Sequence, residues 1–166
     1  MFFFFTEQEV RSSAQRSKLA MESYPEKLSN IINNQENKSK FDVFLSNSIR
    51  DEELVIGVEN IFKGMGKTVY IDWVFDKHLS RDSVTKETAE TLRHRMKQSS
   101  KLLYLATDNA SSSKWMPWEL GYFDGLKSGN VAILPLVDSV DSSFQGQEYL
   151  GLYPVLDKDS LEKFLD

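Results

Sequence analysis

The fold is decided by residues 41–72, which have the sequence FDVFLSNSIRDEELVIGVENIFKGMGKTVYID. The apolar run at 41–46 predicts a buried strand, and the run at 68–72 predicts another. Between them, residues 51–63 carry apolar side chains at helical spacing, and glycines then mark where the helix ends. A strand, a helix and a second strand in this order predict a βαβ unit with parallel strands.

The same alternation continues along the rest of the chain. The further segments predicted are loop 73–82, helix 85–98, strand 101–106, helix 116–127, strand 131–136, strand 149–156 and helix 160–165. Because the strands are almost continuously apolar, both faces of the sheet must be covered. The sequence therefore predicts an α/β fold, with a parallel five-stranded sheet and helices on both faces.

The first part of the chain has a different pattern. Thr6, with Glu9 three residues later, forms a capping-box pattern that predicts a helix to about residue 23. Pro25 is expected to end or interrupt this helix, and a polar connector follows, with a short helix around residues 28–32. We therefore expect two parts. Residues 1–39 form an N-terminal helical extension with a polar connector, and residues 40–166 form the main domain.

Four consecutive phenylalanines, Phe2–Phe5, stand at the N-terminus. No basic residue precedes them and acidic residues follow at once, so the run does not resemble a signal peptide. It is also too short to span a bilayer. We expect these side chains either to pack on the domain or to contact another subunit.

The composition excludes several classes of function. The 166 residues carry a net charge of -5, so nothing indicates nucleic acid or a membrane as a partner. The sequence has no cysteine, which excludes disulfides and thiolate chemistry, and its two histidines form no metal-binding motif. We predict no metal site and a cytoplasmic location.

The functional site is expected at one edge of the sheet. Right-handed crossovers place the carboxyl ends of all parallel strands there, and ligands bind at that edge in such folds. Ser46, Asp72 and the cluster around Glu119 lie in or after segments that reach it, so we expect them to converge. The segments that leave this edge are 47–51, 72–82 and 107–119.

The most unusual local sequence is SKWMPWELGY at residues 113–122. It places one carboxylate, Glu119, beside Trp115 and Trp118. Tryptophan faces attract cations, and a partly desolvated carboxylate can hold a ribose hydroxyl or stabilise positive charge. This combination suits the nicotinamide riboside part of NAD+. The alternative is that both tryptophans are core residues and Glu119 is a solvated surface charge.

In their order and spacing, these motifs resemble those of bacterial TIR domains. Residues 41–46 are similar to the family's first strand and 69–72 to its second, and 73–82 lies where the family has its BB loop. The pattern Ser113-x-Trp115-x-x-Trp118-Glu119-Leu120 resembles its catalytic segment. The resemblance covers about residues 40–136. It implies a flavodoxin-like TIR fold of the stand-alone, NAD+-consuming type found in Thoeris-like anti-phage defence.

The resemblance implies an enzyme that cleaves the nicotinamide–ribose bond and releases ADP-ribose or a cyclic form of it. Nicotinamide leaves as a neutral molecule, so the ribose left behind is an oxocarbenium-like cation. Glu119 would hold the ribose hydroxyls and offset that charge, Trp115 would stack on nicotinamide and Trp118 would wall the pocket. NAD+ is then the substrate, and no cofactor is expected.

Four more residues are predicted to bind the substrate. Ser46 and Asn47, at the end of the first predicted strand, would contact the ribose or the carboxamide. Arg50 would reach the diphosphate, and Asp72 would contact the ligand or shape the loop after it. Each has a structural alternative, since an arginine at a helix start, for example, is usually solvated.

Two other functions fit the residues. A non-catalytic TIR–TIR interaction module would recruit partners, although it has no evident reason to keep the Trp–Glu cluster. A nucleoside 2-deoxyribosyltransferase also uses a glutamate on a glycosidic bond. For the enzyme, the resemblance implies homo-oligomers built through TIR–TIR contacts. We expect activation through assembly, an N-terminal contact or a separate sensor or effector protein.

Overall fold

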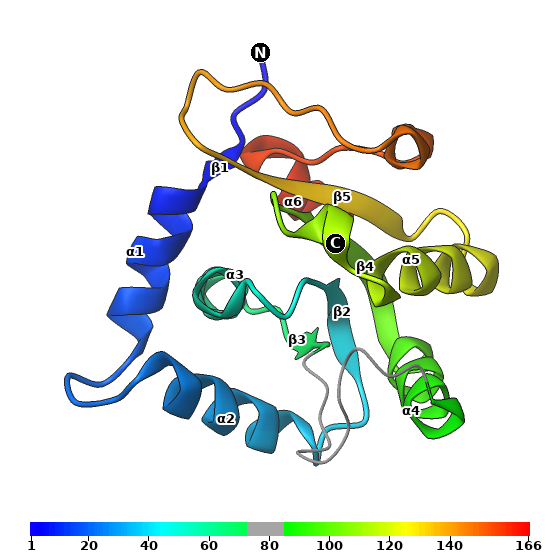
Figure 1. The fold of residues 1–166 in the computed structure, drawn as a ribbon, viewed down its shortest axis with the longest axis horizontal. Coiled ribbons are helices and arrows are strands. Elements are labelled where there is room, and N and C mark those ends of the chain that lie inside the picture. Colours follow the sequence, from blue (N-terminus) through cyan, green and yellow to red (C-terminus); the bar gives the residue numbers. More distant parts are fainter. Residues whose placement is uncertain (73–84) are drawn as a thin grey trace.

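The computed structural model describes residues 1–72 and 85–166, and these contain a sheet of five parallel strands (Figure 1). The order across the sheet is β1-β5-β4-β2-β3. Four of the predicted strands are confirmed, because their apolar runs are buried on both faces as the pattern required. The strands are β1 (Phe5–Thr6), β2 (Phe41–Ser46), β3 (Val69–Ile71), β4 (Ser99–Ala106) and β5 (Val131–Val137).

Helices cover both faces of this sheet, as predicted. Figure 1 shows α1 and α3 on one side of the strands and α4 and α5 on the other. None of the described helices is long and apolar enough to cross a membrane. The helices are α1 (Glu7–Ser17), α2 (Tyr24–Gln35), α3 (Glu52–Gly64), α4 (Lys86–Lys97), α5 (Trp115–Leu126) and α6 (Lys158–Leu165), with 3-10 helices η1 (Ala110–Ser112) and η2 (Glu148–Leu152).

Each face of the sheet has its own apolar layer. Val43 and Leu45 of β2 belong to the layer shared with α1, α3 and α6. Phe44 of β2 and Tyr104 of β4 belong to the opposite layer, with α4 and α5. The division follows from the strand pleat, because successive side chains point to opposite faces.

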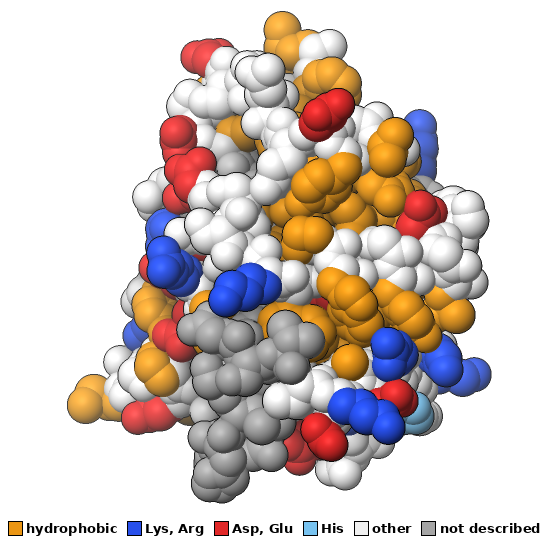
Figure 2. All heavy atoms as spheres, turned by 45° about the vertical axis from the view of Figure 1, so that its right-hand side comes forward, with side chains coloured by type: hydrophobic (Ala, Val, Ile, Leu, Met, Phe, Trp, Pro, Cys, Tyr) orange, Lys and Arg blue, Asp and Glu red, His pale blue; other side chains and the backbone are white. Residues whose placement is uncertain are grey.

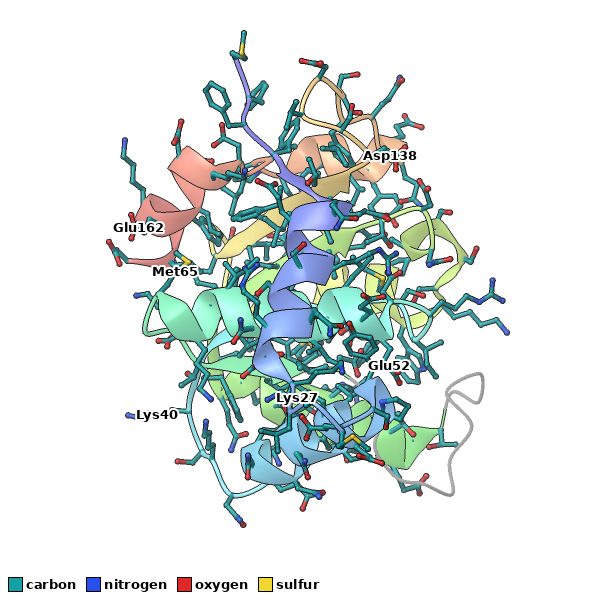
Figure 3. The ribbon with its side chains drawn as sticks, turned by 90° about the vertical axis from the view of Figure 1, so that its left-hand side faces the viewer. Lys27, Lys40, Glu52, Met65, Asp138 and Glu162 are labelled. Carbon is teal, nitrogen blue, oxygen red and sulfur yellow. The ribbon has the colours of Figure 1, made fainter. Side chains whose placement is uncertain are left out.

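The N-terminal extension shares this core. The predicted capping box at Thr6 and Glu9 is present and starts α1. Figure 3 shows α1 lying across α3. The approach is so close that a Cβ added at Gly57 of α3 would stand 2.1 Å from the carbonyl oxygen of Val10. Residues before and after 40 are therefore packed together, and the division into two domains remains a prediction.

The boundary predicted at Pro25 is wrong. Helix α1 already ends at Ser17, and Pro25 lies in the first turn of α2. Ser23 caps α2, and its Oγ accepts a hydrogen bond from the backbone N–H of Glu26 at 3.2 Å. Proline suits a first turn because its missing N–H would have no partner within the helix. The connector is therefore mostly helical, and the short helix expected around residues 28–32 is part of the longer α2.

The fifth strand predicted at 149–156 is wrong for most of its length. Residues Glu148–Leu152 form η2 instead, which buries Leu150 in the core. Only Val155 pairs with the sheet, as a single parallel bridge to Ile133. Strand β1 pairs with β5 further along the same edge. The fifth position of the sheet is therefore shared by two segments from opposite ends of the chain.

The opposite edge of the sheet is closed by a side chain. Gln35, the last residue of α2, is buried. Its Nε2 donates a hydrogen bond to the carbonyl oxygen of Ile71 at 3.1 Å, and its Oε1 accepts one from the Ile71 N–H at 3.1 Å. The glutamine amide thus takes the place of a neighbouring strand at the end of β3.

Candidate active site

The carboxyl ends of the strands gather on one side of the molecule, as the topology predicted. Figure 3 shows Glu52, which begins α3 after β2, and Asp138, which follows β5, on that side. Lys40 and Met65, which precede β2 and β3, lie on the other side. The segments that leave β2, β4 and β5 therefore begin at a common edge.

A buried hydrogen bond joins two of the predicted site residues at this edge. Ser46 Oγ, at the end of β2, donates to Glu119 Oε1 of α5 at 2.8 Å. Both residues are 0% exposed. The predicted convergence of Ser46 and Glu119 is confirmed, and the alternative that Glu119 is a surface charge is wrong. A carboxylate in such surroundings interacts more strongly with nearby charge than it would in water.

The local sequence explains why Glu119 points into the molecule. Ser113 Oγ accepts a hydrogen bond from the Met116 N–H at 3.2 Å, which satisfies a donor in the first turn of α5. Pro117 in that turn has no N–H to satisfy. Trp115 and Glu119 are one helical turn apart and therefore share a face. That face turns toward the sheet, since Trp115 is also buried.

Trp118 belongs to a row of rings that continues outward along α5. Its ring meets Trp115 edge-on at 5.4 Å and stacks on Tyr122 at 5.7 Å. The guanidinium of Arg93, from α4, lies 5.4 Å from the Trp118 ring centre and 5.8 Å from that of Tyr122. Figure 2 shows hydrophobic side chains gathered on this side of the molecule, with Lys and Arg side chains below them. Sequence reasoning gave Arg93 no such role.

The segment after β2 lies against the start of α5. Asn47 is buried, and its Nδ2 donates to the Ser48 carbonyl oxygen at 3.2 Å. Residues 48–50 and 112–115 line a cavity of about 80 Å³ between them. Arg50 and Lys114 are the charged residues of this lining, so we call it the cationic recess. Arg50 is exposed there, at a place where an anionic group could reach it.

Asp51 holds the neighbouring loops together, which the sequence did not reveal. It is buried, and its carboxylate accepts hydrogen bonds from Thr107 Oγ1 and, at 2.7 Å, from Asn109 Nδ2. These bonds tie the start of α3 to the loop after β4. The only sequence signal was an aspartate before a helix, and here it makes no side-chain cap to that helix.

Asp72 follows β3 and is fully buried. Its backbone N–H donates to the Leu45 carbonyl oxygen at 3.4 Å, so Asp72 lies beside the end of β2, as predicted. The BB loop predicted at 73–82 lies outside the described residues. The role of Asp72 in binding a ligand therefore stays a prediction.

Tyr104 is a further residue of this region that the sequence did not indicate. It is the register partner of Ser46 on the adjacent strand β4. Its hydroxyl lies 3.4 Å from that of Tyr149 and donates to Gln147 Oε1 at 3.3 Å. Burial raises the pKa of Tyr104, and the hydrogen bond to Tyr149 and the charge of Glu119 raise it further. The hydroxyl therefore stays protonated beside the Ser46–Glu119 pair.

The parallel sheet, in which strands β2 to β5 lie in the order β3-β2-β4-β5, defines an α/β protein of the flavodoxin-like class. No protein-family model matches this chain. A probable 3′ cyclic ADP-D-ribose synthase ThsB′ of Bacillus cereus (strain MSX-D12) is 46% identical over 135 residues, which are 81% of this chain and 69% of that protein. A putative cyclic ADP-D-ribose synthase TIR2 of Cytobacillus dafuensis is 34% identical over 91 residues, which are 54% of this chain and 24% of that protein.

Among solved structures, the TIR domain of the Toll-related receptor TRR-2 of Hydra magnipapillata has a TM-score of 0.49 and 16% identity, over 75% of this chain and 92% of that one. The match to ThsB′ covers most of both chains at high identity. This chain belongs to the family of bacterial TIR proteins that includes ThsB′. The resemblance noted in the motifs is thereby confirmed.

Proposed function

We propose that this chain is an enzyme that cleaves the nicotinamide–ribose bond of NAD+ and closes the remaining ADP-ribose into a ring. The observation that carries the proposal is the buried Ser46–Glu119 pair at the ligand-binding edge of the sheet. The proposal of a cyclic product rests on two relatives that are named as cyclic ADP-D-ribose synthases.

In the proposed mechanism, the bonding electron pair leaves with nicotinamide, which departs as a neutral molecule. The ribose C1′ becomes an oxocarbenium-like cation, and the Glu119 carboxylate stabilises it through charge and through hydrogen bonds to the ribose hydroxyls. The Ser46 hydroxyl donates to one carboxylate oxygen and so holds the orientation of the group. A hydroxyl of the adenosine part then attacks C1′ and loses its proton, which closes the ring. Water in its place would give ADP-ribose.

The remaining predicted site residues have supporting roles in this proposal. Trp115 would stack on nicotinamide and Trp118 would wall the pocket. Trp118 is already held by Tyr122 and Arg93, so its ring is positioned before any ligand binds. Asn47 and Asp72 would contact the ribose or carboxamide from the ends of β2 and β3. Arg50 of the cationic recess would bind the diphosphate.

The proposal also covers the partners of the protein and its location in the cell. NAD+ is the substrate, so the reaction as written uses no cofactor. We expect the protein to work in the cytoplasm as a homo-oligomer with TIR–TIR contacts. We also expect a separate protein to act with it, as a sensor or as an effector. Such a signal-forming enzyme would serve anti-phage defence, in line with the family resemblance.

The test is to incubate the purified protein with NAD+, at high protein concentration to favour assembly, and to resolve the products by chromatography with mass detection. Glu119→Gln keeps the size of the side chain and removes its charge. Glu162→Gln, an exposed glutamate on α6, is the matched control. We expect nicotinamide release by the parent and the control, and its loss in Glu119→Gln.

The mass of the product formed together with nicotinamide then identifies the type of reaction. A mass equal to ADP-ribose less one water identifies the cyclic form, and ADP-ribose itself identifies hydrolysis. Equal turnover by Glu119→Gln and the parent would remove Glu119 from catalysis. A folded, assembled parent that releases no nicotinamide at any concentration would overturn the proposal in favour of a non-catalytic interaction module.

A further inference from the structure

A second, larger cavity opens at the same edge of the sheet, between the segment after β4 and the segment after β5. Its volume is about 490 Å³, which falls in the roughly 300–1,000 Å³ range of small-molecule sites. It is lined by parts of residues 104–111, 136–138 and 142–150. We call it the β4–β5 cavity. None of the site residues predicted from the sequence lines it.

The chemistry of the cavity favours a neutral ring with hydroxyl groups. Leu136, Leu150 and Phe144 provide apolar surface against which a flat ring can pack. Around them lie serine, threonine and glutamine side chains, and the carboxylates of Asp108 and Asp138. None of the described residues of the lining is Lys, Arg or His, so a phosphate would be repelled.

A nucleoside matches these features. An adenine face can stack on an aromatic side chain, and its edge accepts and donates hydrogen bonds. An aspartate at the carboxyl edge of a parallel sheet is the group that accepts hydrogen bonds from ribose hydroxyls in dinucleotide-binding folds. Asp108 follows β4 and Asp138 follows β5, so both stand at that edge. Figure 3 shows Asp138 on the same side of the molecule as Glu52.

The cavity is a neighbour of the Ser46–Glu119 pair. Tyr104 lines the cavity and is also the register partner of Ser46. The charge of Glu119 contributes to the raised pKa of Tyr104. On the other side, η1 separates the cavity from the cationic recess, since Ser111 lines the first and Ser112 the second. A cationic and an anionic compartment therefore lie on the two sides of one short helix.

We propose that the β4–β5 cavity receives the adenosine half of NAD+, while the diphosphate crosses η1 at the cationic recess. This inference rests on the proposed function, because it extends the same substrate into a second compartment. It places the adenosine ribose in the compartment next to the one that holds C1′, with Tyr104 at the boundary between them. A substrate folded back in this way has its two ribose groups on neighbouring sides of the edge, as ring closure requires.

The first test is the binding of adenosine itself, measured by calorimetry. Ser111→Trp fills the cavity from η1, and Gln145→Trp fills it from the opposite wall. Both positions are exposed, so the fold should tolerate the larger side chain. Ser128→Trp is the control, because Ser128 is exposed in the loop before β5, at the other end of that strand. We expect the parent and the control to bind adenosine and both filled variants to lose about tenfold or more in affinity.

The second test compares NAD+ with nicotinamide mononucleotide, which lacks the adenosine half. We expect the parent to prefer NAD+ in kcat/KM and the filled variants to lose that preference, with nicotinamide mononucleotide turnover unchanged. No adenosine binding by the parent, or equal binding by the filled variants, would overturn the assignment. Adenosine binding with an unchanged substrate preference would make the cavity a site for a free nucleoside and would also overturn it.

The two proposals fail in different ways. If the parent turns over neither substrate, the proposed function fails, whereas adenosine binding still reports on the cavity by itself. If the parent turns over NAD+ but the filled variants behave like the control in both tests, the enzyme stands and the cavity assignment falls.

Discussion

Ser46 Oγ donates its hydrogen bond to Glu119 Oε1 over 2.8 Å, and no solvent reaches either side chain. A hydrogen bond to a carboxylate oxygen restricts the orientation of the whole group. The hydroxyl therefore holds the Glu119 carboxylate in one orientation at the end of β2.

The first prediction concerns Ser46→Ala. Loss of the hydroxyl should leave the Glu119 carboxylate less well oriented and lower kcat for nicotinamide release. The rate at neutral pH should fall about tenfold, the change expected for roughly 1.4 kcal/mol of transition-state stabilisation. Ser128→Ala, at an exposed position, is the control. A rate for Ser46→Ala equal to that of the control would show that Ser46 does not position the carboxylate.

The second prediction concerns the contact between α1 and α3. Gly57→Ala would force a Cβ to within 2.1 Å of the Val10 carbonyl oxygen, so the two helices must separate. We expect a loss of about 1–3 kcal/mol or more in the free energy of unfolding, measured with urea. Gly125→Ala on α5 meets no atom within 4 Å and should be neutral or slightly stabilising. Equal stability of the two variants would mean that α1 docks less tightly than the structure shows.

The third prediction concerns pH and Asp157. Hydrogen bonds from Ser160 and from the Phe3 N–H lower the pKa of Asp157 to about 2. Because the folded-state pKa is depressed, this carboxylate stabilises the fold above its ordinary pKa, and the contribution is lost as the pH falls through about 2.

Asp157→Asn should therefore lower the urea midpoint at pH 7, and the difference from the parent should shrink as the pH approaches 2. Asp159→Asn, an exposed aspartate in the same helix turn, should show little difference at either pH. A gap between Asp157→Asn and the parent that is constant across this range would argue against the assignment.

The fourth prediction concerns the phenylalanine run. Phe4 is buried, and Phe5 lies in β1, whereas Phe2 and Phe3 are 63% and 52% exposed. Replacing Phe2 and Phe3 together with serine should leave the melting temperature unchanged and reduce the oligomer mass seen by light scattering. A deletion of residues 1–5 would remove β1 as well and could not separate the two effects. An unchanged mass would exclude these side chains from assembly.

Most of the fold could be predicted from the sequence because β2, β4 and β5 are buried on both faces and leave continuous apolar runs. Strand β1 could not be predicted, since two residues have no periodicity, and its phenylalanines fit several environments. Pro25 was assigned to the wrong end of a helix, because proline both ends a helix and suits the first turn of the next. Leu150 was placed in a strand because a short apolar run does not distinguish a strand from a 3-10 helix.

The residues of the candidate site were likewise predicted only in part. Ser46 and Glu119 were expected to converge because the topology brings strand ends and the following helices to one edge. Tyr104 and Asp51 were not found, because their partners become neighbours only when strands and loops are placed side by side. A tyrosine inside an apolar run looks like core, and an aspartate before a helix looks like a cap. The catalytic and binding roles of all the site residues remain predictions.

The amide of Gln35 has a consequence for how copies of this protein can associate. An unoccupied outer strand offers its backbone to another chain, and sheets that extend in this way form fibres that rarely dissolve. With both backbone groups of Ile71 already engaged by Gln35, a second copy finds no template at that end of β3. At this point of the molecule, another copy can be contacted only through side chains, and such contacts separate when the concentration falls. If the proposed homo-oligomer forms, contacts of that kind would let it come apart again on dilution.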